Sequence, residues 1–189
     1  MSNAGGMSTI TRYTDMLAGN TTWAPWEPQG AYDALSTVTV PSGGLASITF
    51  AAIPQGYKHL QIRALALTTG ALWFQTNIND DSSTNYASHA LYGNGASVSA
   101  FGTATGVAAY GYTALINATG QSALVMDFLD YSSTTKNKTV RSLWGNDRNG
   151  SGDIGINSFF RPAELGAINS IKITATLQQH SQFTLYGVR

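Results

Sequence analysis

The sequence contains no cysteine. This absence excludes a disulfide framework, a thiolate metal site and a cysteine nucleophile. Long hydrophobic runs are missing as well, because no apolar stretch approaches the roughly 18 to 20 residues that span a membrane. The first residues also lack the basic and apolar regions of a signal peptide. We therefore expect a protein that has no membrane partner and is not exported by that route.

Charged side chains are scarce. Asp, Glu, Lys and Arg make up 11% of the chain and balance to a net charge of zero, whereas about 25% is usual in globular proteins. Polar runs such as those at 82–85 and 132–135 solvate the surface instead. A surface without a long-range field does not attract polyanions, which disfavours nucleic acid as a partner. Neutral hydroxyls and amides suit contact with sugars or between identical subunits, since little charge has to be desolvated.

Residues 1–31 show no sustained periodicity and are interrupted by glycines and prolines. A chain of 189 residues suits one domain, so we expect an extended N-terminal arm over residues 1–31 and one folded domain over residues 32–189. Two prolines stiffen the arm and display Trp23 and Trp26 on it. Two indoles need a surface that buries them. That surface belongs either to the arm's own domain or to another subunit, and we favour another subunit, with Trp23 and Trp26 as partner-binding residues.

From about Leu35 onward, apolar residues alternate with polar ones, which is the period of half-buried strands. Val38 and Val40 alternate with threonines, and a turn sequence at 41–44 leads into 48–50, which predicts a hairpin. Further one-sided strands are predicted at 59–64, 72–78, 171–177 and 183–186.

Three stretches carry more specific expectations. Leu72 and Phe74 share one face of a strand, opposite Trp73. The run 123–129 is apolar on both faces, which predicts a central strand in a sheet that is covered on both sides. Only residues 162–166 suit a helical turn.

Turn-rich breaks separate about ten short strands at spacings near ten residues. This pattern predicts an all-β fold, namely an antiparallel β-sandwich, jelly-roll-like, with an extended N-terminal arm. A closed barrel is the second choice. The sequence contains no internal repeat, so a repetitive fibre shaft is not indicated.

Catalytic groups are few, with three histidines and no Gly-x-Ser-x-Gly elbow. His59, His89 and His180 each fit a structural position better than a catalytic one. Asp127 and Asp130 are three residues apart on a predicted strand, so they point to opposite faces and do not form a paired acid and base. We expect neither an enzyme nor a cofactor, with a hydrolase as a minor alternative.

One segment has a metal-binding pattern. Residues 147–154 resemble the first eight positions of a calcium-binding EF-hand loop, with oxygen ligands at alternate residues and Gly152 at the sharp turn. However, Ser158 stands where the loop requires a bidentate glutamate, and neither flank is helical. We therefore interpret the segment as a hairpin turn and predict no metal site.

Five segments occur in a recognisable order and spacing. They lie at 53–63, beginning Ile-Pro-Gln-Gly-Tyr, and at 85–89, 91–95, 130–139 and 183–188. Together they resemble a family of small tailed-bacteriophage virion structural proteins, over residues 35–189. Members are described as tail-fibre, decoration or unassigned virion proteins, so the resemblance implies location on a virion and brings no catalytic residue.

The same motifs have local meanings. The Ile-Pro-Gln-Gly-Tyr stretch at 53–57 predicts a strand end, a glycine turn and an aromatic that starts the next strand, which together form a sheet corner. Gly187, within Leu-Tyr-Gly of the last strand, predicts a close approach of the backbone to another group.

The leading functional expectation is a capsid decoration or cement protein that stabilises the shell through subunit contacts. Its partners would be the major capsid protein and further copies of itself, a trimer being one candidate oligomer. The alternative is a tail-fibre or receptor-binding module that recognises host surface glycans. In that case the ligand-facing aromatics would come from Trp73, Tyr86, Tyr92 and Trp144.

Overall fold

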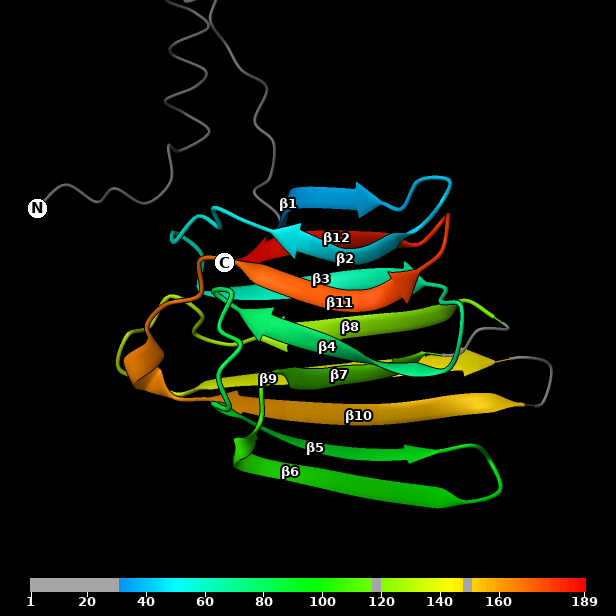
Figure 1. Cartoon of the computed structure of the whole chain (residues 1–189). Coiled ribbons are helices and arrows are strands. Elements are labelled where there is room, and N and C mark those ends of the chain that lie inside the picture. Colours follow the sequence, from blue (N-terminus) through cyan, green and yellow to red (C-terminus); the bar gives the residue numbers. More distant parts are fainter. Residues whose placement is uncertain (1–30, 117–119, 148–150) are drawn as a thin grey trace, which may run out of the picture. The chain divides into compact units, whose positions relative to one another are not determined.

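The computed structural model describes residues 31–116, 120–147 and 151–189. Within these ranges it consists of β-strands, turns and one short 3₁₀ helix (Figure 1). The strands are β1 (Tyr32–Thr39), β2 (Leu45–Phe50), β3 (His59–Ala66), β4 (Leu72–Ile78), β5 (Tyr86–Gly93), β6 (Val98–Ala108), β7 (Gly111–Ile116), β8 (Ser122–Phe128), β9 (Lys138–Asp147), β10 (Gly152–Arg161), β11 (Ile171–Leu177) and β12 (Gln182–Val188). The 3₁₀ helix, Ala163–Leu165, lies where the helical turn was predicted.

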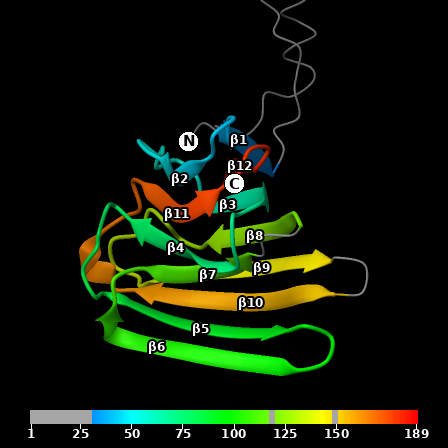
Figure 2. The same cartoon turned by 45° about the vertical axis from the view of Figure 1, so that its right-hand side comes forward.

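The strands form two antiparallel sheets. One has eight strands in the order β1-β12-β3-β8-β9-β10-β5-β6, and the other has four in the order β2-β11-β4-β7. Figures 1 and 2 show the smaller sheet lying over the larger one, with β5 and β6 at the far edge of the larger sheet. The predicted all-β sandwich is confirmed. Its jelly-roll-like connectivity stays a prediction, and the first thirty residues lie outside the described part.

The inner faces of the two sheets form one core. The predicted alternation is confirmed in β3, where Leu60, Ile62 and Ala64 are buried, and in β11 and β12. Phe74 of the smaller sheet meets Phe183 of the larger one with ring centroids 6.0 Å apart. Period-two alternation therefore identifies the inward face of these strands, because each buries its apolar side against the opposite sheet.

The predicted hairpin at 38–50 is wrong. A turn is present, since the Gly44 amide donates to the Pro41 carbonyl oxygen at 3.1 Å. However, β1 pairs with β12 in the larger sheet, and β2 pairs with β11 in the smaller one. The turn thus carries the chain from one sheet to the other. Alternation gives each strand a buried face, but it does not specify the neighbouring strand.

The corner predicted at 53–57 is confirmed, because this segment joins β2 in the smaller sheet to β3 in the larger one. The strand ends predicted there are wrong, since β2 ends at Phe50 and β3 begins at His59. The side-chain amide of Gln55 donates to the carbonyl oxygens of Ile53 and Ile168, at 2.8 and 3.0 Å. The hydroxyl of Tyr131 donates to the carbonyl oxygen of Pro54. These bonds satisfy backbone groups that no strand reaches.

The expectation for 123–129 is half right. β8 is central, as the fourth of eight strands, and its inner residues Leu124 and Met126 are buried. Its outer residues Ala123 and Val125 lie at the surface, because within the described ranges no element covers that side of the sheet. The second apolar face of β8 is therefore part of the molecular surface.

The segment with the calcium-like pattern joins β9 to β10, which pair as a hairpin from Gly152 opposite Asp147. The predicted hairpin is confirmed, while residues 148–150 lie outside the described part. Among the described residues, no helix is long and apolar enough to cross a membrane.

Candidate interaction surfaces

The exposed side of the larger sheet carries an unusual concentration of large aliphatic side chains. Six of them are between 48% and 74% exposed: Leu65, Leu91, Val98, Leu143, Ile154 and Ile156. They come from β3, β5, β6, β9 and β10, five strands of one sheet. We call these six residues the outer apolar face.

The pairing register makes this face continuous. One row across the sheet runs Arg63, Val125, Leu143, Ile156, Leu91 and Ala100. The next row runs Leu65, Ala123, Gly145, Ile154, Gly93 and Val98. Residues opposite each other in register share a side of the sheet and lie about 5 Å apart. The two rows therefore form one apolar band and not a set of scattered residues.

A polar row borders the band. The side-chain amide of Gln61 donates to Asp127 at 2.8 Å, and the Asp127 carboxylate lies 3.7 Å from the guanidinium of Arg141. A shallow groove of about 670 Å³ is lined by residues of both, among them Leu143 and Ile156 of the band and Arg141 of the polar row. Contiguous apolar surface with a polar border is typical of an interaction site.

The sequence analysis did not predict the outer apolar face, although the residues of β8 contained an indication of it. Apolar residues on both faces of 123–129 indicated that its second face also needs a cover. In β10 the pattern is misleading, because Ile154 and Ile156 face outward while Gly155 and Asn157 are buried. A hydrophobic pattern alone assigns those two isoleucines to the core.

A second feature is an aromatic cluster between β4 and β7 of the smaller sheet and β5, β6 and β9 of the larger one. Trp73 is its hub, with ring centroids 5.5 Å from Tyr92, 5.1 Å from Phe101, 6.0 Å from Tyr112 and 5.9 Å from Trp144. Trp144 is buried, whereas the other four are half-buried. Most contacts are edge-to-face, a geometry that stabilises aromatic pairs.

The alternation predicted at 72–78 is present, since Phe74 and Ile78 are buried while Trp73 is half-buried, but the Trp73 ring still reaches the core. Both rings reach inner-face residues of the larger sheet, Trp73 meeting Trp144 and Phe74 meeting Phe183. The pairing of β4 with β7 shifts register between Trp73 and Gln75. The extra residue of this bulge lies in β7, where the successive residues Thr113 and Ala114 are both buried.

Two of the four candidate ligand-facing aromatics are core residues. Trp144 is 1% exposed and Tyr86 is 0% exposed, so neither can meet a ligand at the surface. The hydroxyl of Tyr86 donates to the carbonyl oxygen of Asp81 at 3.1 Å and accepts from the amide of Ile78 at 3.0 Å. The structure brings Trp73, Tyr92 and Trp144 into one cluster and leaves Tyr86 outside it.

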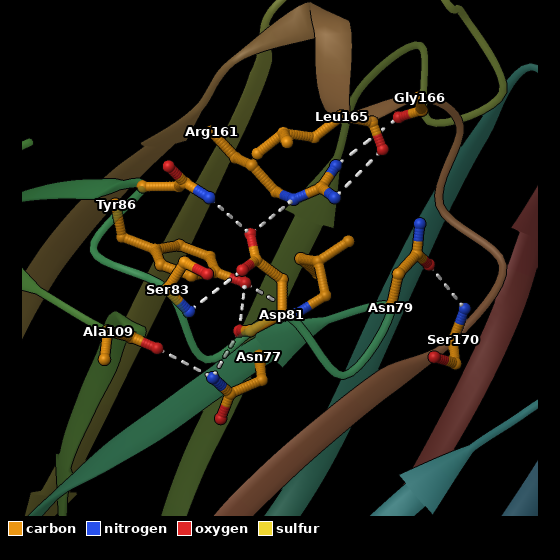
Figure 3. A network of polar contacts seen from close by, with 12 residues as sticks. Asn77, Asn79, Asp81, Ser83, Tyr86, Ala109, Arg161, Leu165, Gly166 and Ser170 are labelled. Carbon is orange, nitrogen blue, oxygen red and sulfur yellow. Dashed lines mark hydrogen bonds and ion pairs between the residues drawn. The ribbon is translucent and has the colours of Figure 1, made fainter.

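Figure 3 shows a network of polar contacts at the end of the sandwich where β4, β5 and β10 meet their loops. The buried guanidinium of Arg161 lies 3.7 Å from the carboxylate of Asp81 and donates to the carbonyl oxygens of Leu165 and Gly166. The Asp81 carboxylate also accepts hydrogen bonds from Ser83 and Asn85. These bonds fasten the loops after β4 and β10 to each other, which is a structural role.

A buried lysine lies beside this network. Lys138 is 1% exposed and stands opposite Arg161 in the β9–β10 ladder. Its ammonium group donates to the carbonyl oxygens of Ser133 and Lys136, so it closes the turn before β9. Burial, and then the neighbouring Arg161 charge, lowers the pKa of Lys138. Because backbone carbonyl oxygens accept the hydrogen bonds of its ammonium group, Lys138 holds this turn in place and has a structural role.

The carboxylates considered for catalysis have separate partners. Asp127 lies on the outer side of β8 beside Gln61, whereas Asp130 lies in the turn after the strand, with a positive φ of 48°. The expectation that both belong to one strand is therefore wrong. Asp130 pairs with Lys136 at 2.6 Å, and its amide donates to Nδ1 of His59 at 2.9 Å. Within the described ranges, no three His, Asp or Glu residues gather as metal ligands would.

Trp23 and Trp26, the predicted partner-binding residues, lie outside the described residues. Comparison of the chain with protein-family models, curated proteins and solved structures gave no match.

Proposed function

We propose that the chain is a structural protein of a bacteriophage virion that acts as a capsid decoration protein. The observation that carries the proposal is the outer apolar face, since six exposed aliphatic residues on one sheet require a partner surface. The scarcity of charge supports it, because little desolvation opposes close contact with other subunits. The five-segment resemblance to phage virion proteins supports a location on the virion.

The energetics favour a protein that binds in several copies. Burying a half-exposed aliphatic side chain contributes about 1 kcal/mol, so the six together contribute about 6 kcal/mol. Association costs about 4 to 15 kcal/mol in lost translational and rotational freedom. One face alone therefore binds weakly. Repeated contacts on a lattice raise the effective concentration of each successive contact, which suits an oligomer on a shell.

The arm at residues 1–31 adds a second contact in this proposal, with Trp23 and Trp26 as anchors on a neighbouring subunit. The double change Trp23→Ala with Trp26→Ala then weakens binding to the particle, or oligomerisation, by at least about tenfold and leaves the unfolding midpoint unchanged. A lower midpoint with unchanged binding contradicts this role, because the indoles would then belong to their own domain's core.

A second candidate function is supported by the aromatic cluster. Trp73, Tyr92 and Tyr112 are half-buried, and partly exposed rings are groups that can stack on sugars. In this case the chain is a tail-fibre or receptor-binding module for host glycans. Binding to a glycan array that is lost in Trp73→Ala but kept in Leu143→Thr favours this candidate.

Counting copies in purified virions by mass spectrometry tests the main proposal. We expect the hundreds of copies that a shell lattice holds. Tens of copies or fewer indicate a tail component, and absence from the virion overturns the proposal.

In the same particles, Leu143→Thr with Ile156→Thr is expected to lower the number of copies bound per virion. Leu129→Thr, which changes an exposed leucine in the turn after β8, is the matched control.

A further inference from the structure

The eight-stranded sheet ends in an open edge at β6. This strand pairs with β5 on one side, and in the described part of the chain no strand pairs with its other side. Figures 1 and 2 both show β6 as the outermost strand of that sheet. The register with β5 is regular from Val98 to Thr103 and then shifts before Ala108. A regular stretch of unpaired backbone donors and acceptors therefore lies at the surface.

The regular part of β6, from Val98 to Thr103, contains nothing that protects such an edge. Natural sheets block open edges with lysines, prolines, inward-pointing charges or covering loops. β6 reads Val-Ser-Ala-Phe-Gly-Thr-Ala-Thr-Gly-Val-Ala and contains no charged residue or proline. Ser99, Ala100 and Gly102 are small and exposed, so they do not hinder the approach of another strand.

The other edges differ. At the opposite edge of the large sheet, β1 is interrupted by a bulge after Ala34, and its Asp33 is paired with Arg189. In the smaller sheet, β7 is covered by the larger one, since the Ser142 hydroxyl donates to the Thr113 carbonyl oxygen. The remaining edge, β2, is six residues long and lies beside Lys172 of β11. β6 is thus the least protected edge among the described strands.

We propose that β6 pairs antiparallel with β6 of a second copy of this chain, about a two-fold axis within residues 98–103. Such an axis sets each residue of the strand against a residue of the identical strand. A charge near the axis would face the same charge, which is unfavourable, and β6 has none. The second copy offers a matching edge of equal length and neutral composition. Pairing joins the two large sheets into one and satisfies the open backbone groups.

This inference stands apart from the proposed virion role, because it concerns the purified chain alone. Its test is sedimentation equilibrium of the full chain with Ser99→Lys and Ser99→Glu. Ser99 is exposed and lies opposite Tyr92, on the side of β6 away from the outer apolar face. We expect the wild type to dimerise and each variant to dimerise about tenfold more weakly. An equimolar mixture of the two variants should recover dimers, because unlike charges then meet.

Two controls identify the surface. Leu143→Thr alters the outer apolar face, and Thr49→Lys places a charge on the β2 edge. Both should dimerise like the wild type. A monomeric wild type, dimers unaffected at Ser99, or dimers weakened equally by either control would overturn the proposal.

Hydrogen exchange of the wild type gives a readout that needs no substitution. Amide protection in β6 should rise with protein concentration while that in β2 stays constant. Protection in β6 that is independent of concentration also overturns the pairing. The virion proposal is tested separately by copy number, so the two can fail independently.

Discussion

The indole N–H of Trp144 donates a hydrogen bond to the side-chain oxygen of Asn157 at 2.7 Å, and both residues are buried. This bond crosses between β9 and β10 on the inner side of the larger sheet. Next to it, a Cβ at Gly155 would lie 2.4 Å from the Trp144 ring, so only glycine fits beneath the indole. The tryptophan therefore turns Gly155 and Asn157 inward and leaves Ile154 and Ile156 outside.

Replacing Asn157 by leucine tests this account. The change leaves the buried indole N–H without an acceptor, which costs about 1 to 3 kcal/mol in the free energy of unfolding. In Trp144→Phe the indole N–H is absent, so adding Asn157→Leu should cost much less there. Chemical denaturation of the two single variants and the double variant measures the coupling. Additive losses would show that the hydrogen bond does not set the face of β10.

These residues also show how far the sequence predicts the structure. Alternation in β3 and β11 identified the buried face correctly, because ordinary aliphatic residues fill the core there. In β10 the hydrophobic pattern would indicate the wrong face, since one large indole and its acceptor replace the aliphatic residues there. The hairpin at 38–50 failed for another reason, because strand partners depend on contacts distant in sequence. The outer apolar face could not be predicted for both of these reasons. Two of its residues lie on β10, where the hydrophobic pattern indicates the wrong face, and its six residues come together only through the pairing of strands that are distant in sequence.

Gly187 lies against the ring of Tyr57, and a Cβ built on it would come within 2.5 Å of the ring carbons. The predicted close approach at this glycine is thus confirmed. Gly187→Ala should lower the free energy of unfolding by about 1 to 3 kcal/mol through overpacking. In the Tyr57→Ala background, the same alanine should cost little. An equal cost in both backgrounds, measured by denaturation, would assign the effect to the backbone instead.

The network around Asp81 predicts a dependence of stability on pH. Burial raises the pKa of Asp81, but hydrogen bonds from Asn85 and Ser83 and the charge of Arg161 outweigh burial and hold the pKa below 3.8. Because the pKa of Asp81 is lower in the folded state than in the unfolded chain, ionised Asp81 stabilises the fold. This contribution to the free energy of unfolding is present above pH 3.8 and is lost as the pH falls through the folded-state pKa.

Asp81→Asn should therefore destabilise the protein by about 1 to 3 kcal/mol at neutral pH, since Arg161 stays buried without its counter-charge. The difference from the wild type should shrink in acid. Thermal unfolding between pH 2 and pH 7 measures both effects. Asp80→Asn changes the exposed neighbouring carboxylate and is the matched control. A constant difference across the pH range would contradict the assignment.

Tyr110 and Tyr112 place their hydroxyl oxygens 3.4 Å apart at the edge of the aromatic cluster. The hydrogen bond with Tyr110, and then burial, raises the pKa of Tyr112 to about 12. Because the pKa of Tyr112 is higher in the folded state than in the unfolded chain, its neutral hydroxyl stabilises the fold. This contribution to the free energy of unfolding is present below pH 10 and is lost as the pH rises toward 12. Tyr110→Phe should bring the pKa of Tyr112 back toward 10, as followed by NMR of labelled tyrosine ring carbons. An unchanged titration would mean that burial, not the hydrogen bond, sets the value.

The outer apolar face should contribute to binding without contributing to folding. Leu143→Thr and Ile156→Thr place a β-branched threonine, which suits a strand, on an exposed strand face, so each should change the free energy of unfolding by about 0.5 kcal/mol or less. Leu124→Thr, on the buried side of β8, should cost about 2 to 4 kcal/mol, because it removes core volume and buries a hydroxyl. The two surface variants should also bind less of a hydrophobic fluorescent dye than the wild type. If they unfold as easily as Leu124→Thr, then the outer leucine and isoleucine belong to the fold itself, and the face is not free to bind a partner.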